Sequence, residues 1–141
     1  MTDALVIIPT YNEKENIEAI IRAVFNQEKE FHILVVDDNS PDGTASIVNK
    51  LMTEFKGKLF IENRTNKNGL GKAYLCGFDW ALQKDYDYII QMDADFSHNP
   101  NDLKFIEVLI KKNDTLWRFE RYKANGHLFC FWHSKTKDSH K

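Results

Sequence analysis

Short apolar runs that alternate with amphipathic helical segments constrain the fold of this chain more than any other feature. Four runs have the length and the continuous apolar character of strands that are buried on both faces: Leu5–Ile8, Ile33–Val36, Leu59–Ile61 and Tyr88–Met92. Between them, apolar residues recur at helical spacing over about residues 13–25, 44–55 and 70–82. Strands that alternate with helices form βαβ units with right-handed crossovers, so the sequence predicts an α/β fold with a parallel sheet.

Capping residues predict where the helices begin. Asn12 followed by Glu15 resembles a capping box for the first helix, with Asn in place of the usual Ser or Thr. Thr44 directly follows a run of turn residues and is the expected N-cap of the second helix. A fourth helix is expected to begin at Asn101 or Asp102, after the last of the four apolar runs.

Composition limits the class of protein. The 141 residues are 43% hydrophobic and 28% charged, which suits a single domain with a core. A net charge of −2 argues against a nucleic-acid partner. Cys76 and Cys130 lack the spacing of zinc ligands, the N-terminus has no signal-peptide pattern, and no apolar run approaches the ~18 residues of a membrane span. We therefore expect a cytoplasmic protein whose membrane contact is at most peripheral.

Three of the predicted strand ends carry distinctive polar residues. These are the segments Pro9–Glu13, Asp37–Asp38 and Asp93–Asp95. In open α/β sheets, ligands bind outside the carboxyl ends of the strands. Because parallel strands bring their carboxyl ends to the same edge, we expect these three segments to meet there although they are far apart in the sequence.

The Asp93-Ala94-Asp95 triplet is the strongest candidate for a metal and diphosphate site. Alternation in an extended segment places the two carboxylates on the same side. Converging carboxylates repel each other unless a cation lies between them, and Mg²⁺ or Mn²⁺ prefers such oxygen ligands together with phosphate and water. A short motif of this kind is also common by chance, so a strand-end turn with solvated acids is the alternative.

Three further segments allow two interpretations each. Asp37–Asp38 occupies the acidic position of dinucleotide-binding folds, but no GxGxxG follows the first strand, and a simple turn is the alternative. Gly69–Lys72 looks like a phosphate loop but fails the Walker pattern, so we interpret it as a flexible start of a helix whose Lys72 could still meet a phosphate. His98 is either a ligand or base beside the acidic pair, or a turn residue.

Four segments, taken together, resemble the inverting family-2 glycosyltransferases, and within them the dolichol-phosphate (polyprenol-phosphate) mannosyltransferases. They occur in the family's order and are Val6–Glu13, Val35–Thr44, Asn68–Tyr74 and Met92–Pro100. The resemblance implies a GT-A type fold with a Rossmann-like, mostly parallel sheet and helices on both faces, of which this chain holds the N-terminal half. It also implies transfer of mannose from GDP-mannose to a dolichyl or polyprenyl phosphate, with Mg²⁺ or Mn²⁺ as the cofactor.

The resemblance further implies a set of site residues. Asp93 and Asp95 are the implied catalytic residues, and Asp95 and Ser97 the implied metal ligands. The implied substrate-binding residues are Pro9, Tyr11, Glu13, Val36, Asp38, Asp93, Ala94, Asp95 and Arg121. The chemistry agrees, because a metal ion neutralises a leaving diphosphate and an anionic phosphate acceptor needs no strong general base.

The match weakens towards the C-terminus. It covers about residues 4–112, so we expect residues 1–112 to be the donor-binding domain and residues 113–141 to be a divergent tail. A truncated gene, a compensated frameshift or a divergent strand would each explain the region before Arg121, which shows no clear period. Two alternatives therefore remain for function: a family-2 transferase that uses a UDP-sugar, and a donor-binding fragment without transferase activity.

Overall fold

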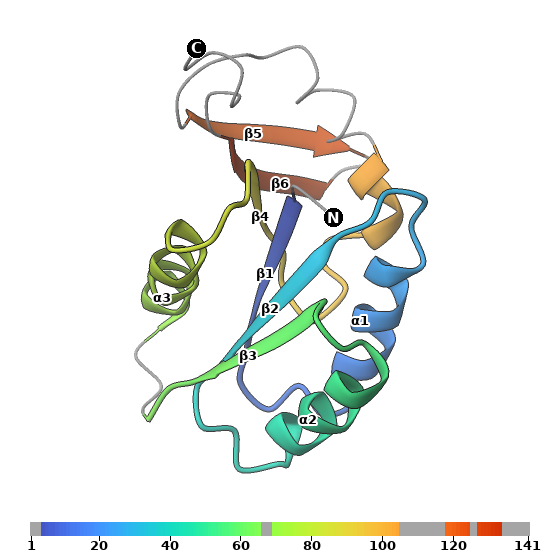
Figure 1. The fold of residues 1–141 in the computed structure, drawn as a ribbon, viewed down its shortest axis with the longest axis vertical. Helices are drawn as coiled ribbons and strands as arrows, with labels where there is room; N and C mark the ends of the chain where they lie inside the picture. The colour runs from blue at the N-terminus through green and yellow to red at the C-terminus, as the bar shows by residue number, and fades with distance from the viewer. Residues whose placement is uncertain (1–3, 66–68, 105–117, 125–126, 134–141) are drawn as a thin grey trace.

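The computed structural model describes residues 4–65, 69–104, 118–124 and 127–133, the last two ranges as backbone (Figure 1). The elements in chain order are β1 (Ala4–Thr10), α1 (Ile17–Phe25), β2 (His32–Asp37), α2 (Thr44–Glu54), β3 (Leu59–Asn63), α3 (Leu70–Leu82), β4 (Tyr88–Gln91), the 3₁₀ helix η1 (Pro100–Asp102), β5 (Arg118–Ala124) and β6 (His127–His133). The four strands and three helices predicted from the apolar patterns are therefore confirmed.

The strands form a six-stranded sheet in the order β3-β2-β1-β4-β6-β5. Strands β3, β2, β1 and β4 are parallel, whereas β6 pairs antiparallel with both β4 and β5. The two antiparallel strands lie within residues 113–141, for which the sequence analysis assigned no element. The apolar run 128–132 was the signal for β6, and its register beside β4 extends the sheet that holds the candidate site.

The parallel strands are covered on both faces, as the α/β prediction requires. Alternate residues of β1 enter two separate clusters, with Val6 and Ile8 facing helices α1 and α2, and Leu5 and Ile7 facing helix α3 (Figure 1). All four side chains are fully buried, which is why the strand reads as a continuous apolar run. Gly77 lets α3 approach closely, because a Cβ there would lie 2.7 Å from Ile7 Cγ2.

The first helix begins later than its predicted capping box. Asn12 has a left-handed backbone with φ of 56° and lies four residues before the N-cap Asn16, and α1 begins at Ile17. The carbonyl of Glu13 accepts from the backbone N–H groups of Asn16 and Ile17, at 3.0 and 2.9 Å. The Asn12–Glu15 prediction was wrong because residues 12–14 bond to a neighbouring loop instead of capping their own helix.

Two other helix starts also differ from the expected positions. Thr44 is the first residue of α2 rather than its N-cap, since Gly43 takes the N-cap position with φ of 91°. The expected fourth helix starts as the 3₁₀ turn η1, which the side chain of Asn99 caps by accepting from the Asn101 backbone N–H at 3.0 Å. Asn101 and Asp102 therefore lie inside this turn, Leu103 and Lys104 continue it as helix, and the expected fourth helix falls outside the described residues from position 105 on.

Candidate functional site

A pocket of about 250 Å³ lies at the carboxyl ends of β1, β2 and β4 and at the beginning of α3. Three strand-end segments that are far apart in the sequence meet in it, as the parallel sheet predicted. It is lined by Pro9, Thr10, Tyr11, Glu13, Asp38, Gly69, Leu70, Ala73, Asp93, Ala94 and Asp95. The lining therefore includes every predicted site residue except Val36, Ser97 and Arg121.

These three predicted residues occupy other positions. Val36 is fully buried within β2, with its side chain in the cluster beneath α3. Ser97 is exposed in the turn after Asp95. Arg121 lies in β5 with Cys130 as its register partner, and its side chain is outside the described part of the structure.

Helix α3 also contributes to this pocket, which was not predicted from the sequence. Gly69, Leu70 and Ala73 line it, while Lys72, the residue singled out for a phosphate, points to solvent and is not part of the lining. The Gly-Leu-Gly-Lys motif was the available signal. Its position beside the strand ends follows only from the packing of α3 against β1 and β2.

Residues 12–14 of the loop after β1 are attached to the loop after β2 through three consecutive backbone N–H groups. The N–H of Asn12 donates to Ser40 Oγ at 2.9 Å, and that of Glu13 donates to Thr44 Oγ1 at 3.1 Å. The next N–H, of Lys14, donates to Asp42 Oδ2 at 3.1 Å. The acceptors come from the Ser-Pro-Asp-Gly-Thr segment, so this motif holds the loop that carries Tyr11 and Glu13 at the edge of the pocket.

The acidic pair after β2 divides into one inward and one pocket-facing residue. The carboxylate of Asp37, 1% exposed, accepts from Thr10 Oγ1 at 2.7 Å and from the N–H and hydroxyl of Ser40 at 2.9 and 2.7 Å. Asp38 lines the pocket, and its Oδ1 lies 3.4 Å from Arg64 Nη1. These two atoms form an ion pair without the alignment of a hydrogen bond. Asp37 thus shapes the loop, and Asp38 contributes negative charge to the pocket.

The Asp93–Asp95 triplet places both carboxylates on the pocket lining. Tyr74 donates its hydroxyl proton to Asp93 Oδ1 at 2.8 Å. Hydrogen bonds from Ser97, first from its hydroxyl and then from its backbone N–H, hold the pKa of Asp95 below its ordinary value. Asp95 is therefore an exposed anion at neutral pH.

Of the two interpretations of His98, the geometry supports the turn residue. Its Nδ1 accepts from the backbone N–H of Asp93 at 3.1 Å. This bond closes a turn that contains Phe96 in a left-handed conformation with φ of 62°, which is rare for an aromatic residue.

The donor atoms of this pocket suit a hard divalent cation that is shared with a phosphate. Asp93 and Asp95 offer carboxylate oxygens, which Mg²⁺ and Mn²⁺ prefer. Among the residues that the structure describes, no group of three or more His, Cys, Asp or Glu side chains is placed to hold a metal ion by itself. An ion here would therefore need further ligands, and Mg²⁺ commonly takes these from phosphates and water.

The sheet order and the position of the pocket define a GT-A type fold, and comparisons with known proteins agree. Residues 5–138 match the family model described as glycosyl transferase family 2, a span that passes the end of the recognised motifs. The chain belongs to this family. Within the described residues, none of the helices combines the length and apolar character that a membrane span requires.

Two relatives and one solved structure illustrate the similarity. Polyprenol monophosphomannose synthase of Mycolicibacterium smegmatis is 50% identical over 122 residues, covering 86% of this chain and 46% of the relative. Undecaprenyl-phosphate mannosyltransferase of Micrococcus luteus is 43% identical over 99 residues, covering 70% and 40%. The mannosyltransferase PcManGT from Pyrobaculum calidifontis, solved with GDP-Man and Mn²⁺, superposes with a TM-score of 0.72 at 22% identity, covering 92% and 44%. The chain thus spans less than half the length of the curated relatives it matches.

Proposed function

We propose that this chain is the donor-binding part of an inverting mannosyltransferase that moves mannose from GDP-mannose to a dolichyl or polyprenyl phosphate. The observation that carries the proposal is a single pocket in which residues from three separate strand ends and helix α3 lie together. The names of the two relatives, a polyprenol monophosphomannose synthase and an undecaprenyl-phosphate mannosyltransferase, support the choice of sugar and acceptor. A volume of about 250 Å³ is below the ~300–1,000 Å³ of most small-molecule sites, so this pocket would hold part of a nucleotide sugar.

The two sides of the pocket suggest which part of the donor each would bind. Pro9, Tyr11 and Glu13 would line the nucleoside side, where Tyr11 has 37% of its surface exposed and could stack its ring on a base. Asp38 would accept hydrogen bonds from the ribose hydroxyls, since a carboxylate is an acceptor without a proton to give. Ala94, a small residue between two acids, would leave room for the diphosphate.

The implied residues outside the lining would act at its margins. Val36 was implied as a contact of the base, but the whole residue is 0% exposed in β2 between β1 and β3, so a contact with the donor would require the end of this strand to open. Ser97 would supply a further metal ligand from the turn after Asp95, and Arg121 would contact the donor phosphate.

Asp93 and Asp95 would act together on the diphosphate side. A bound Mg²⁺ or Mn²⁺ would neutralise the charge that develops on the leaving GDP. Asp95 would hold such an ion as an anion, since the hydrogen bonds from Ser97 keep its pKa low. Asp93 is fixed by Tyr74 and would keep the diphosphate aligned with the bond to be broken.

A lipid-phosphate acceptor would not require a strong general base among the described residues. A lipid phosphate is already anionic at neutral pH, so its oxygen can attack without a strong general base. Inversion then requires in-line positioning of donor and acceptor. Such an acceptor would place the reaction at a membrane surface, with the chain in the cytoplasm or peripheral to the cytoplasmic face.

Titration calorimetry of the folded chain with GDP, with and without Mn²⁺, tests the donor site. We expect binding that depends on Mn²⁺ and is removed by EDTA, and we expect Asp95→Asn to lower the affinity measured with Mn²⁺ by at least about tenfold, close to 1.4 kcal/mol. Its melting temperature should stay near that of the wild type, because an exposed strand-end acid is not part of the core. A folded wild-type chain that gives no heat with GDP and Mn²⁺ would contradict the proposal.

Two further measurements separate the alternatives. Competition between GDP-mannose and UDP-glucose distinguishes a mannosyl donor from a UDP-sugar, and we expect GDP-mannose to bind more tightly. Incubation with GDP-mannose and a short polyprenyl phosphate tests transfer itself. Donor binding without transfer would identify this chain as a donor-binding fragment.

A further inference from the structure

Two groups of Asp93, its carboxylate and its backbone N–H, each form a hydrogen bond to a side chain from a different part of the chain. Its Oδ1 accepts from the Tyr74 hydroxyl on helix α3, and its backbone N–H donates to Nδ1 of His98 in the following turn. The preceding N–H, of Met92, still bonds the carbonyl of Ile7 on β1 at 3.0 Å. The N–H of Asp93, directly after the residue that still bonds β1, is thus held by a side chain.

Tyr74 connects one wall of the pocket with the acidic triplet. Its helix neighbour Ala73 lines the pocket, as do Gly69 and Leu70 in the first turn of α3. The hydroxyl of Tyr74 reaches across to Asp93 at 2.8 Å. A shift of this helix end would therefore move Asp93, and the hydrogen bond opposes independent movement of the two walls.

His98 fixes the other end of the segment. Since Nδ1 accepts from the Asp93 N–H, the proton of the neutral imidazole is on Nε2. The bond links residues 93 and 98, and the turn between them carries Asp95 and Ser97, which are themselves joined by a 3.0 Å hydrogen bond. The left-handed Phe96 lies in the same turn and needs such closure to persist.

We propose that Tyr74 and His98 are positioning residues of the donor site. They hold Asp93 and the turn that follows it in the arrangement that receives the diphosphate and its metal ion. The inference rests on the proposed function, since it assigns both residues a role in donor binding. Losing either contact is expected to weaken donor binding about fivefold, which corresponds to about 1 kcal/mol.

Tyr74→Phe tests the first contact, and Tyr86→Phe is its matched control. Both substitutions remove one hydroxyl from a partly buried tyrosine, and the Tyr86 hydroxyl makes a 2.7 Å hydrogen bond to His32 outside the pocket lining. By calorimetry with GDP and Mn²⁺, we expect Tyr74→Phe to weaken binding about fivefold and Tyr86→Phe to stay within twofold of wild type. Without Mn²⁺, neither variant should give a binding signal with GDP, as for the wild type. Equal affinities of the two variants in the presence of Mn²⁺ would overturn the role of Tyr74.

His98→Asn and His98→Ala test the second contact. The amide oxygen that His98→Asn introduces lies at the same distance along the side chain as Nδ1, so it can accept from the Asp93 N–H, whereas His98→Ala offers no acceptor. We expect His98→Ala to weaken binding with Mn²⁺ about fivefold and His98→Asn to restore most of the loss. An affinity of His98→Asn as low as that of His98→Ala would show that the acceptor is not what matters.

Hydrogen exchange of the Asp93 amide in the ligand-free protein provides a readout that does not depend on donor binding. Exchange should be faster in His98→Ala and close to wild type in His98→Asn. If the wild type binds GDP and the variants behave alike, the positioning role falls and the proposed function stands. If the folded wild type does not bind, both fall, whatever the exchange rates are.

Discussion

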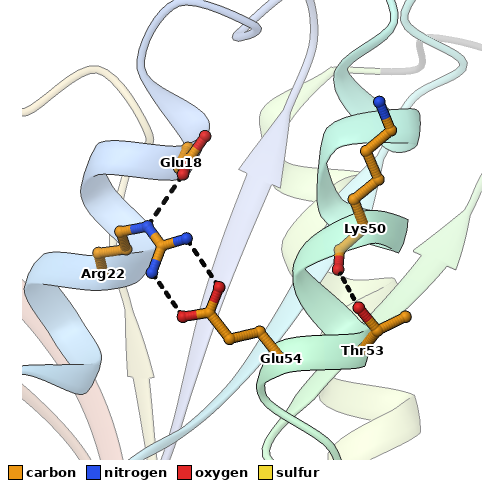
Figure 2. A network of polar contacts seen from close by, with 5 residues as sticks. All are labelled: Glu18, Arg22, Lys50, Thr53 and Glu54. Atoms are coloured by element: carbon orange, nitrogen blue, oxygen red, sulfur yellow. Dashed lines mark hydrogen bonds and ion pairs between the residues drawn. The ribbon is translucent and has the colours of Figure 1, made fainter.

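Two polar networks of this molecule have hydrogen bonds of similar length in very different surroundings. At the carboxyl ends of β1 and β2, the Asp37 carboxylate accepts from the hydroxyls of Thr10 and Ser40 at 2.7 Å each and is 1% exposed. On the outer surface of helices α1 and α2, Arg22 donates to Glu54 at 2.6 and 2.9 Å, with 44% and 50% of these side chains exposed (Figure 2). Bond length alone would rank the two networks as equals.

Burial separates them. Water solvates the Arg22 network when its bonds break, and salt screens its charges, so exposed pairs of this kind contribute little to stability. The Asp37 carboxylate and the Thr10 hydroxyl have little access to water and Ser40 is only partly exposed, so each donor left without its acceptor there costs about 1–3 kcal/mol. The buried network also fixes the loops beside the pocket, whereas the exposed one joins α1 to α2, and neither Arg22 nor Glu54 lines that pocket.

The largest effect should come from Asp37→Ala. It would leave three donors without their acceptor, the Thr10 hydroxyl and both the N–H and hydroxyl of Ser40. We expect a loss of about 3–5 kcal/mol in the free energy of unfolding, measured by urea denaturation. Asp37→Asn keeps one acceptor and should cost less. A loss below about 1 kcal/mol for Asp37→Ala would show that water replaces the carboxylate and would remove the contrast between the networks.

Thr44→Val should have an intermediate effect. Thr44 is fully buried, and its hydroxyl accepts from the Glu13 N–H while it bonds Asp42 Oδ1. The substitution keeps the shape of the side chain and removes the hydroxyl, so we expect a loss of about 1–2 kcal/mol in the same denaturation experiment. Thr44→Ser is the matched control, because it retains the hydroxyl and loses only a methyl group. Equal losses in both variants would assign the effect to packing.

The contact between His32 and Tyr86 is partly buried and lies between the two networks in exposure. The pH dependence of stability tests its contribution. His32 Nδ1 lies 2.7 Å from the Tyr86 hydroxyl, and burial raises the pKa of Tyr86 to about 12, so the phenol stays neutral. Burial also lowers the pKa of His32 from 6.5, with Glu30 opposing and Lys58 adding to the shift. Below about pH 6.5 the unfolded chain therefore binds more protons than the folded chain. The contribution of neutral His32 to the free energy of unfolding is complete above about pH 6.5 and is lost as the pH falls through the folded pKa.

The measurement is the free energy of unfolding from pH 7.5 to 5, compared between the wild type and His32→Gln. We expect a shallower fall towards acid pH in the variant, because its side chain at this position does not titrate. Parallel curves would show that His32 has the same pKa in the folded and unfolded states.

The smallest effect should come from the exposed network. Arg22 bonds Glu54 and Glu18 and lies over the Phe55 ring, so Arg22→Met keeps part of the packing and removes the charge (Figure 2). We expect the melting temperature to change by no more than about 1–2 °C, and the change to shrink further in 0.5 M NaCl. A loss of stability as large as that caused by Asp37→Ala would contradict the comparison. It would show that exposure does not decide how much these hydrogen bonds contribute to stability.

Much of the fold and of the site follows from local patterns in the sequence. Continuous apolar runs identified the parallel strands, because strands buried on both faces must be apolar at every position. Polar residues directly after those runs identified most of the pocket lining, because carboxyl ends meet at one edge. Strands β5 and β6 were missed, since residues 118–124 and 127–133 show no clear period of two although they pair antiparallel.

The residues that hold the site were harder to identify than the residues that form it. Asp37 and Asp38 are adjacent and chemically identical, yet the first is buried among hydroxyl donors and the second faces the pocket. Asn12 looked like a helix cap, but its N–H bonds Ser40, which is 28 residues away. Local propensity could not predict these contacts, because the partner groups come from other strand ends.

The sequence by itself determined the family, the alternating α/β order and the strand ends at which a ligand can bind. These depend on residue type and spacing along the chain, which the motifs record directly. The tertiary structure alone decided that α3 forms one wall of the pocket, that Tyr74 and His98 hold Asp93, and that the Ser-Pro-Asp-Gly-Thr segment supports the loop after β1. Hydrogen bonds between distant segments depend on where the packed core brings them, and no local pattern specifies that placement.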